Sequence, residues 1–139
     1  MREMKELGAA LVEAEHWVDE LMRRLGWHDR DKVFSALIAA LHGLRDSLPR
    51  DEAIFLASSL PPLLRGLYYE GWHARTPPGA KGEEAFLERI RDGVDRDVGI
   101  DADSVAHAVF AQLAARLPAA ELEDVKAATP KALHFLWPV

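Results

Sequence analysis

Ser47-Leu48-Pro49-Arg50-Asp51-Glu52 recurs 69 residues further along the chain as Arg116-Leu117-Pro118-Ala119-Ala120-Glu121. An internal repeat of this kind predicts two similar halves. The same shift aligns further apolar positions: Trp17, Leu21 and Leu25 with Phe86, Ile90 and Val94; Leu60-Pro61-Pro62-Leu63-Leu64 with Thr129-Pro130-Lys131-Ala132-Leu133; and Leu67-Tyr68 with Leu136-Trp137. The repeated residues are apolar positions, prolines and helix starts. The repeat therefore predicts a core and indicates no catalytic or binding function.

The composition is that of a globular protein. The chain has 139 residues, of which 49% are hydrophobic and 29% charged, which suits one compact domain spanning 1–139. No apolar run approaches the ~18 residues needed to cross a bilayer, and the first six residues are too charged for a signal peptide. The chain has no cysteine. We therefore expect a cytoplasmic protein that does not enter a membrane.

The charge distribution argues against a nucleic-acid partner. The net charge is −6, and both parts of the chain are acidic: residues 1–75 carry 10 basic and 12 acidic side chains, and residues 76–139 carry 7 and 11. Binding to a phosphate backbone depends on clustered Lys and Arg, and no basic tract is present.

Apolar residues recur at helical spacing throughout, and no stretch alternates as a strand would. The sequence predicts an all-α bundle of about eight helices in two similar four-helix repeats, at about 14–72 and 83–138, joined by a linker at 73–82. Asp29 or Asp31 and Asp101 or Asp103 are candidate N-caps, and Gly26 is a candidate helix stop. The expected helices lie at about 2–26, 31–47, 50–59, 61–70, 83–98, 102–116, 119–128 and 130–137.

The first expected helix carries an unbroken heptad seam. Its apolar residues are spaced by alternating steps of three and four, at the lower limit of a coiled-coil pattern. A seam of this kind packs either within its own bundle or against a second chain, because both arrangements bury the same residues. The seam consists of Met4, Leu7, Leu11, Ala14, Val18, Leu21 and Leu25.

The two repeats differ at positions that bear on surface exposure. Ile54 and Phe55 correspond to Glu123 and Asp124, so two apolar side chains stand where the other half has carboxylates. If the halves fold alike, something must cover Ile54 and Phe55. Either residues 1–15 cover them, or a second copy or another protein does.

His107 corresponds to Ile38 and is therefore expected on a core-facing helical position. A histidine there must satisfy its ring nitrogens or lie near the edge of the core. We expect a half-buried His with one hydrogen bond, and a pH-sensing or ligand role is the alternative.

Metal and catalytic motifs are weak. Glu13 and His16, and Glu70 and His73, have the i,i+3 spacing found in di-iron bundles, but Gly71 is expected to end its helix and break the second pair. No His-Glu-x-x-His, no Ser-His-Asp set and no phosphate-binding loop is present. We expect no metal, no cofactor and no enzymatic activity.

The densest group of functional side chain types lies on about two helical turns. Arg65 and Tyr69 are i,i+4 neighbours, as are Tyr68 and Trp72. These four residues could form a pocket in which Arg65 binds an anion, or an aromatic lock between the repeats. Trp137 at the position matching Tyr68 favours the lock.

The same segment carries a family resemblance. The stretches Ala40–Pro49, Ser59–Trp72, Phe86-Leu87 and Leu136-Trp137-Pro138 resemble the signature of the bacterial family called domain of unknown function 2267. The resemblance covers about residues 14–138 and implies a small all-α bacterial protein of two similar helical halves. It implies no activity, and the segment before Glu13 lies outside the pattern.

The sequence therefore supports two function hypotheses. The first is a non-enzymatic interaction or self-association module, whose partner is either a second copy bound through the N-terminal helix or an unknown protein. Its contact residues would be Met4, Leu7, Leu11, Ile54 and Phe55. The second is a small-ligand domain that uses Arg65, Tyr68, Tyr69 and Trp72, with anions among its candidate ligands.

Overall fold

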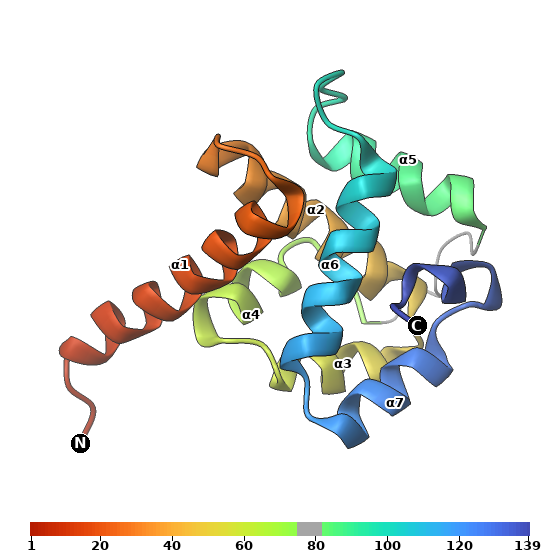
Figure 1. Ribbon diagram of the computed structural model, residues 1–139. Helices are drawn as coiled ribbons and strands as arrows, with labels where there is room; N and C mark the ends of the chain where they lie inside the picture. Colours follow the sequence, from red (N-terminus) through yellow and green to blue (C-terminus); the bar gives the residue numbers. More distant parts are fainter. Residues whose placement is uncertain (75–81) are drawn as a thin grey trace.

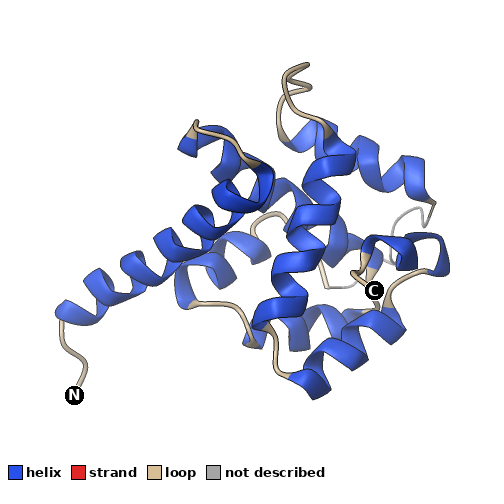
Figure 2. Ribbon diagram, in the orientation of Figure 1, coloured by secondary structure: helices blue, strands red, loops and turns tan. Residues whose placement is uncertain are grey.

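A computed structural model describes residues 1–74 and 82–139, and these form helices joined by short loops (Figures 1 and 2). No strand occurs in the described part of the chain, so the expected all-α class is confirmed. The elements are α1 (Lys5–Leu25), α2 (Arg30–Ser47), α3 (Arg50–Ser58), α4 (Pro62–Tyr69), α5 (Glu83–Gly93), α6 (Ala102–Arg116), α7 (Ala119–Ala128) and the 3-10 helix η1 (Lys131–Leu136).

Local side-chain chemistry sets several helix ends. The Asp29 carboxylate accepts hydrogen bonds from the backbone N–H groups of Asp31 and Lys32, at 3.1 and 3.2 Å, so Asp29 caps α2. Asp101 caps α6 in the same way. Gly26 ends α1 with a φ of 71°, a left-handed conformation that glycine adopts without steric cost.

Two predicted elements differ from the structure. The expected helix at 83–98 ends at Gly93, because Asp95 and Arg96 take left-handed φ values of 55° and 53° that no α-helix continues through. The expected helix at 130–137 is the 3-10 helix η1. Its six residues follow Pro130 and are too few to favour α-helical hydrogen bonding over the tighter 3-10 pattern.

The core lies around α2 and α6, which pack against each other. α1 and α5 each contact both of these helices. α5 approaches α2 closely at two glycines: a Cβ at Gly43 would lie 3.1 Å from the Phe86 ring, and one at Gly93 would lie 2.6 Å from Ala39 Cβ. Small residues at the crossing therefore allow the helices to pack at short range.

Several residues matched by the 69-residue shift are buried in both halves of the chain. Trp17 and Phe86 are both buried, and Leu21 and Ile90 are fully so. The same is true of Leu64 and Leu133. The two-repeat organisation and its boundaries stay predictions. Most of the expected linker, residues 75–81, lies outside the described residues.

His107 is more exposed than expected. Its ring packs against the Phe135 ring at a centroid distance of 5.7 Å, and Nδ1 lies 3.0 Å from the Asp103 carbonyl oxygen. The position is at the edge of the core rather than inside it, and its counterpart Ile38 is itself only half-buried. The single expected hydrogen bond is present, but the side chain faces solvent.

Candidate interaction surface

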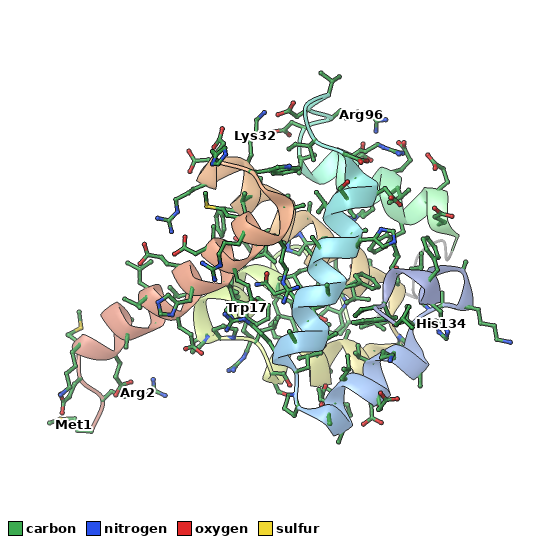
Figure 3. All side chains as sticks on the ribbon, viewed as in Figure 1. Met1, Arg2, Trp17, Lys32, Arg96 and His134 are labelled. Atoms are coloured by element: carbon green, nitrogen blue, oxygen red, sulfur yellow. The ribbon has the colours of Figure 1, made fainter. Side chains whose placement is uncertain are left out.

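α1 is packed along one half and free along the other. Trp17, Val18 and Leu21 are buried in the core. Figure 1 shows the N-terminal half of α1 extending away from the other helices, and Figure 3 places Met1 and Arg2 at its free end. We call residues 4–13 the overhang. Its seam residues Met4, Leu7 and Leu11 are 81%, 59% and 53% exposed. The N-terminal part of the heptad seam is therefore more than half exposed.

An open apolar groove of about 230 Å³ begins where the overhang joins the body. α1, α2 and α4 form its walls, and we call it the α1 groove. Phe34 and Leu63, which are 39% and 38% exposed, lie on its α2 and α4 sides. The full lining is Leu11, Ala14, Glu15, Val18, Arg30, Asp31, Phe34, Leu63, Leu64 and Leu67. Leu11 belongs to both the overhang and the groove.

Charged side chains stand beside the groove and along the overhang. Arg30 pairs with Asp19 at 3.1 Å and lies 3.8 Å from Glu15. On the overhang side, Arg2 pairs with Glu6 and Lys5 with Glu3, each at 3.1 Å. All these pairs are solvent-exposed, so they contribute little stability and can exchange partners readily.

Ile54 and Phe55 lie on α3, are 36% and 58% exposed, and do not line the groove. The alternative that residues 1–15 cover them is therefore wrong. α1 is anchored by Trp17, Val18 and Leu21, so its free end points away from the core, and in Figure 1 α4 lies between that end and α3. The five expected contact residues therefore lie on two surfaces. Met4, Leu7 and Leu11 lie on α1, and Ile54 and Phe55 lie on α3.

Two of the four residues in the expected ligand pocket bind to nearby backbone. The Arg65 guanidinium donates to the carbonyl oxygens of Ala57 and Leu60, at 2.9 and 3.0 Å. The Tyr68 hydroxyl is buried and donates to the Ala53 carbonyl at 2.8 Å.

Three of the four residues lie in contact through their rings. The Tyr69 ring lies 5.4 Å from the Tyr68 ring and 5.5 Å from the Trp72 ring. The backbone contacts of Arg65 and Tyr68 all fall within residues 53–60, so the polar atoms of the cluster join α4 to α3 and the α3–α4 loop.

Sequence reasoning missed the buried arginine that holds the end of α4. Arg45 Nη1 donates to the carbonyl oxygens of Tyr68 and Glu70, both at 2.7 Å, and Arg45 Nε donates to Asp46 at 2.8 Å. A cation is favoured there because the carbonyl end of a helix carries partial negative charge. His42 Nε2 donates to the Leu67 carbonyl at 2.7 Å, and burial lowers the pKa of His42.

Phe34 and Leu63 were also missed as surface residues, although the repeat held a signal. The 69-residue shift pairs Phe34 with Asp103 and Leu63 with Ala132. Phe34 against Asp103 is the same kind of asymmetry that identified Ile54 and Phe55, whereas Leu63 against Ala132 pairs two apolar residues and gave no such signal. The sequence could not show that Phe34 and Leu63 line one groove, because that depends on how α2 and α4 pack.

A pair of glutamates lies between α3 and α7, which pack together. Glu52 and Glu121 are matched by the 69-residue shift, and each has one carboxylate oxygen that is buried without a hydrogen-bond partner among the described residues. Burial raises the pKa of both carboxyls. The negative charges of Glu121 and Asp124 raise the pKa of Glu52 further, and Asp124 does the same for Glu121.

Among residues 1–74 and 82–139, no group of three or more His, Cys, Asp or Glu side chains could hold a metal ion. Within the same residues, no helix is both long and apolar enough to cross a membrane.

Comparison with known proteins gives a family. A family model described as "Uncharacterized conserved protein (DUF2267)" matches residues 14–136, and the chain therefore belongs to this family, as its motifs indicated. No curated protein matches the chain. The matched region includes most of the α1 groove and begins at Ala14, so the overhang lies outside it.

Proposed function

We propose that this member of the DUF2267 family is a non-enzymatic cytoplasmic interaction module that docks an apolar helix face in the α1 groove. One observation carries the proposal: the heptad seam of α1 runs without interruption from the exposed overhang into the lining of the groove. Binding of an amphipathic helix in an apolar groove is a common recognition mode, and its anchors recur at i, i+3, i+4 and i+7.

The exposure of this surface supports docking on energetic grounds. Full burial of one Leu or Phe side chain contributes about 1.5–3 kcal/mol. Leu7, Leu11, Phe34 and Leu63 are each more than a third exposed and lie on or beside the same groove. A partner that covers them would gain several such contributions, against the cost of ordering the complex.

A partner would also add packing to the overhang. The overhang is the N-terminal part of the 21-residue helix α1, whose buried residues begin at Trp17. Most helical stability in proteins comes from tertiary packing of an apolar face, so a bound partner would stabilise the helical conformation of the overhang.

The interaction proposal is favoured over the small-ligand alternative because Arg65 and Tyr68 already donate hydrogen bonds to backbone carbonyls. A ligand would have to displace those bonds. Ile54 and Phe55 form a second exposed apolar patch on α3, which we assign to further protein contact.

Peptide binding tests the docking function. The probe is a fluorescent peptide of residues 2–16, which carries the seam, and the receptor is the full chain with Leu7→Glu, whose groove lining is intact. We expect saturable binding by fluorescence anisotropy, about tenfold or more weaker after a further Phe34→Glu change in the groove. A peptide of the same composition with a scrambled seam is the control. Equal binding of both peptides, or none of either, would contradict a helix-docking groove.

A further inference from the structure

We infer that the occupant of the α1 groove is the overhang of a second copy of this chain, in an antiparallel pair of α1 helices related by a twofold axis near Leu11. This inference rests on the proposed docking function. It adds the identity of the partner, the orientation of the helices and the residues that meet.

The first argument is that α1 is complementary to itself. Leu11 is the last seam residue of the overhang and also lines the groove. Met4 lies seven residues before it and Val18 seven after it, each about 10 Å away at 1.5 Å per residue. A twofold axis near Leu11 therefore sets Met4 of one copy against the groove around Val18 of the other. The symmetry repeats the contact, so one pairing covers both overhangs and both grooves.

The second argument concerns the size of the residues beside the seam. Gly8 and Ala10 flank the seam on its two sides in the helical projection, and a Cβ at Gly8 would meet nothing within 4 Å. Ala14, the next seam residue, is also small. Small flanking residues let the axes of two helices approach closely, which brings Leu7 and Leu11 of each copy within reach of the other groove.

The third argument is electrostatic. Arg2 and Lys5 balance Glu3 and Glu6, so residues 1–12 carry no net charge and the rest of the chain carries the whole −6. The charged residues in the groove lining, Glu15, Arg30 and Asp31, sum to −1. Residues 1–12 therefore enter an acidic groove with no net charge of their own, and Arg2 and Lys5 can exchange their exposed partners Glu6 and Glu3 for carboxylates there. Other surfaces of an acidic second copy would be repelled.

The family match is consistent with this assignment. Residues 14–136 match the family, and they contain every residue that lines the α1 groove except Leu11. The overhang that would fill it lies before Ala14, on the same chain.

The mass of the full chain in solution tests the inference. By light scattering on a sizing column, we expect twice the 15.5 kDa of one chain at high concentration. Leu7→Glu and Phe34→Glu should each weaken the dimer about 100-fold and give the monomer mass. Val12→Glu is the matched control, because Val12 is exposed on the same helix but does not line the groove. Far-ultraviolet circular dichroism and thermal unfolding verify that each variant is folded.

A mixing experiment tests the orientation. Leu7→Glu places a charge on the overhang and leaves the groove intact, and Leu63→Lys places a charge in the groove and leaves the overhang intact. Each variant alone should therefore be monomeric. Mixed together they should form a heterodimer, because one site keeps its intact overhang and groove and the other pairs Glu with Lys. Failure of the mixture to associate would overturn the antiparallel arrangement.

The outcomes separate the inference from the proposed function. A chain that is monomeric at every concentration, but whose groove binds the seam peptide, would overturn the second copy as occupant and leave a different protein partner. A dimer insensitive to both Leu7→Glu and Phe34→Glu would also overturn the inference. A monomer whose groove binds no seam peptide would contradict the docking function itself.

Discussion

Single atoms decide the packing where α5 crosses α2. The Cα of Gly93 approaches Ala39 so closely that an added Cβ would lie 2.6 Å from Ala39 Cβ and 3.2 Å from its Cα. Because one of these atoms is backbone, the helices must separate to accept Gly93→Ala. We expect that change to lower the free energy of unfolding by about 1–3 kcal/mol in urea denaturation.

Gly66→Ala is the matched control. Gly66 also lies within a helix, but nothing stands within 4 Å of its hypothetical Cβ, so the change should raise stability by up to about 1 kcal/mol. Equal effects of the two changes would contradict the close crossing.

Arg45 is the second residue with a large expected effect. Arg45→Met removes the donor to the buried Tyr68 carbonyl and the partly buried Glu70 carbonyl, and leaves Asp46 paired with Arg89 alone. We expect a loss of about 1–3 kcal/mol of unfolding free energy, since the buried Tyr68 carbonyl loses its donor while Asp46 keeps Arg89 at 3.2 Å. Arg50→Met, at an exposed arginine beside Asp51, should change stability by less than about 1 kcal/mol. A small loss for Arg45→Met would show that water replaces the guanidinium.

At the scale of elements, the contact between α3 and α7 is sensitive to pH. Burial and neighbouring carboxylates raise the folded-state pKa of Glu52 and Glu121 above the ordinary glutamate value. The fold therefore favours the protonated forms. Their contribution to stability is fully present below the unfolded-state pKa and is lost as the pH rises through the raised folded-state pKa.

Glu52→Gln should therefore stabilise the protein at neutral pH and have little effect in acid, because glutamine mimics the protonated carboxyl. Thermal unfolding across the acidic to neutral range measures the difference. Glu123→Gln is the control, because Glu123 lies on α7 with its side chain 73% exposed. If Glu52→Gln stabilised the protein equally at every pH, the raised folded-state pKa of Glu52 would be contradicted.

Most elements could be predicted from the sequence, because prolines, aspartate caps and apolar spacing act locally. The end of α5 could not be predicted, because no glycine or proline in the sequence marks the left-handed backbone of Asp95 and Arg96. The exposure of His107 depends on how α6 sits beside Phe135, which a helical period does not reveal.

At the scale of the whole molecule, the sequence predicted the all-α class, the family and the seam of α1. The α1 groove was not predicted, because it forms only when α1, α2 and α4 pack so that Phe34 and Leu63 stand on either side of it. Apolar spacing also could not distinguish the buried half of the seam from the exposed half. Both halves have the same period, and only the packed structure shows where the core ends.

The most direct test of the central claim is amide hydrogen exchange of the overhang in the full chain. If a second copy covers Met4, Leu7 and Leu11, the amides of residues 6–13 should be protected, increasingly so with protein concentration, and Phe34→Glu should abolish that protection. Fast exchange of these amides at every concentration would contradict an overhang that docks in a groove.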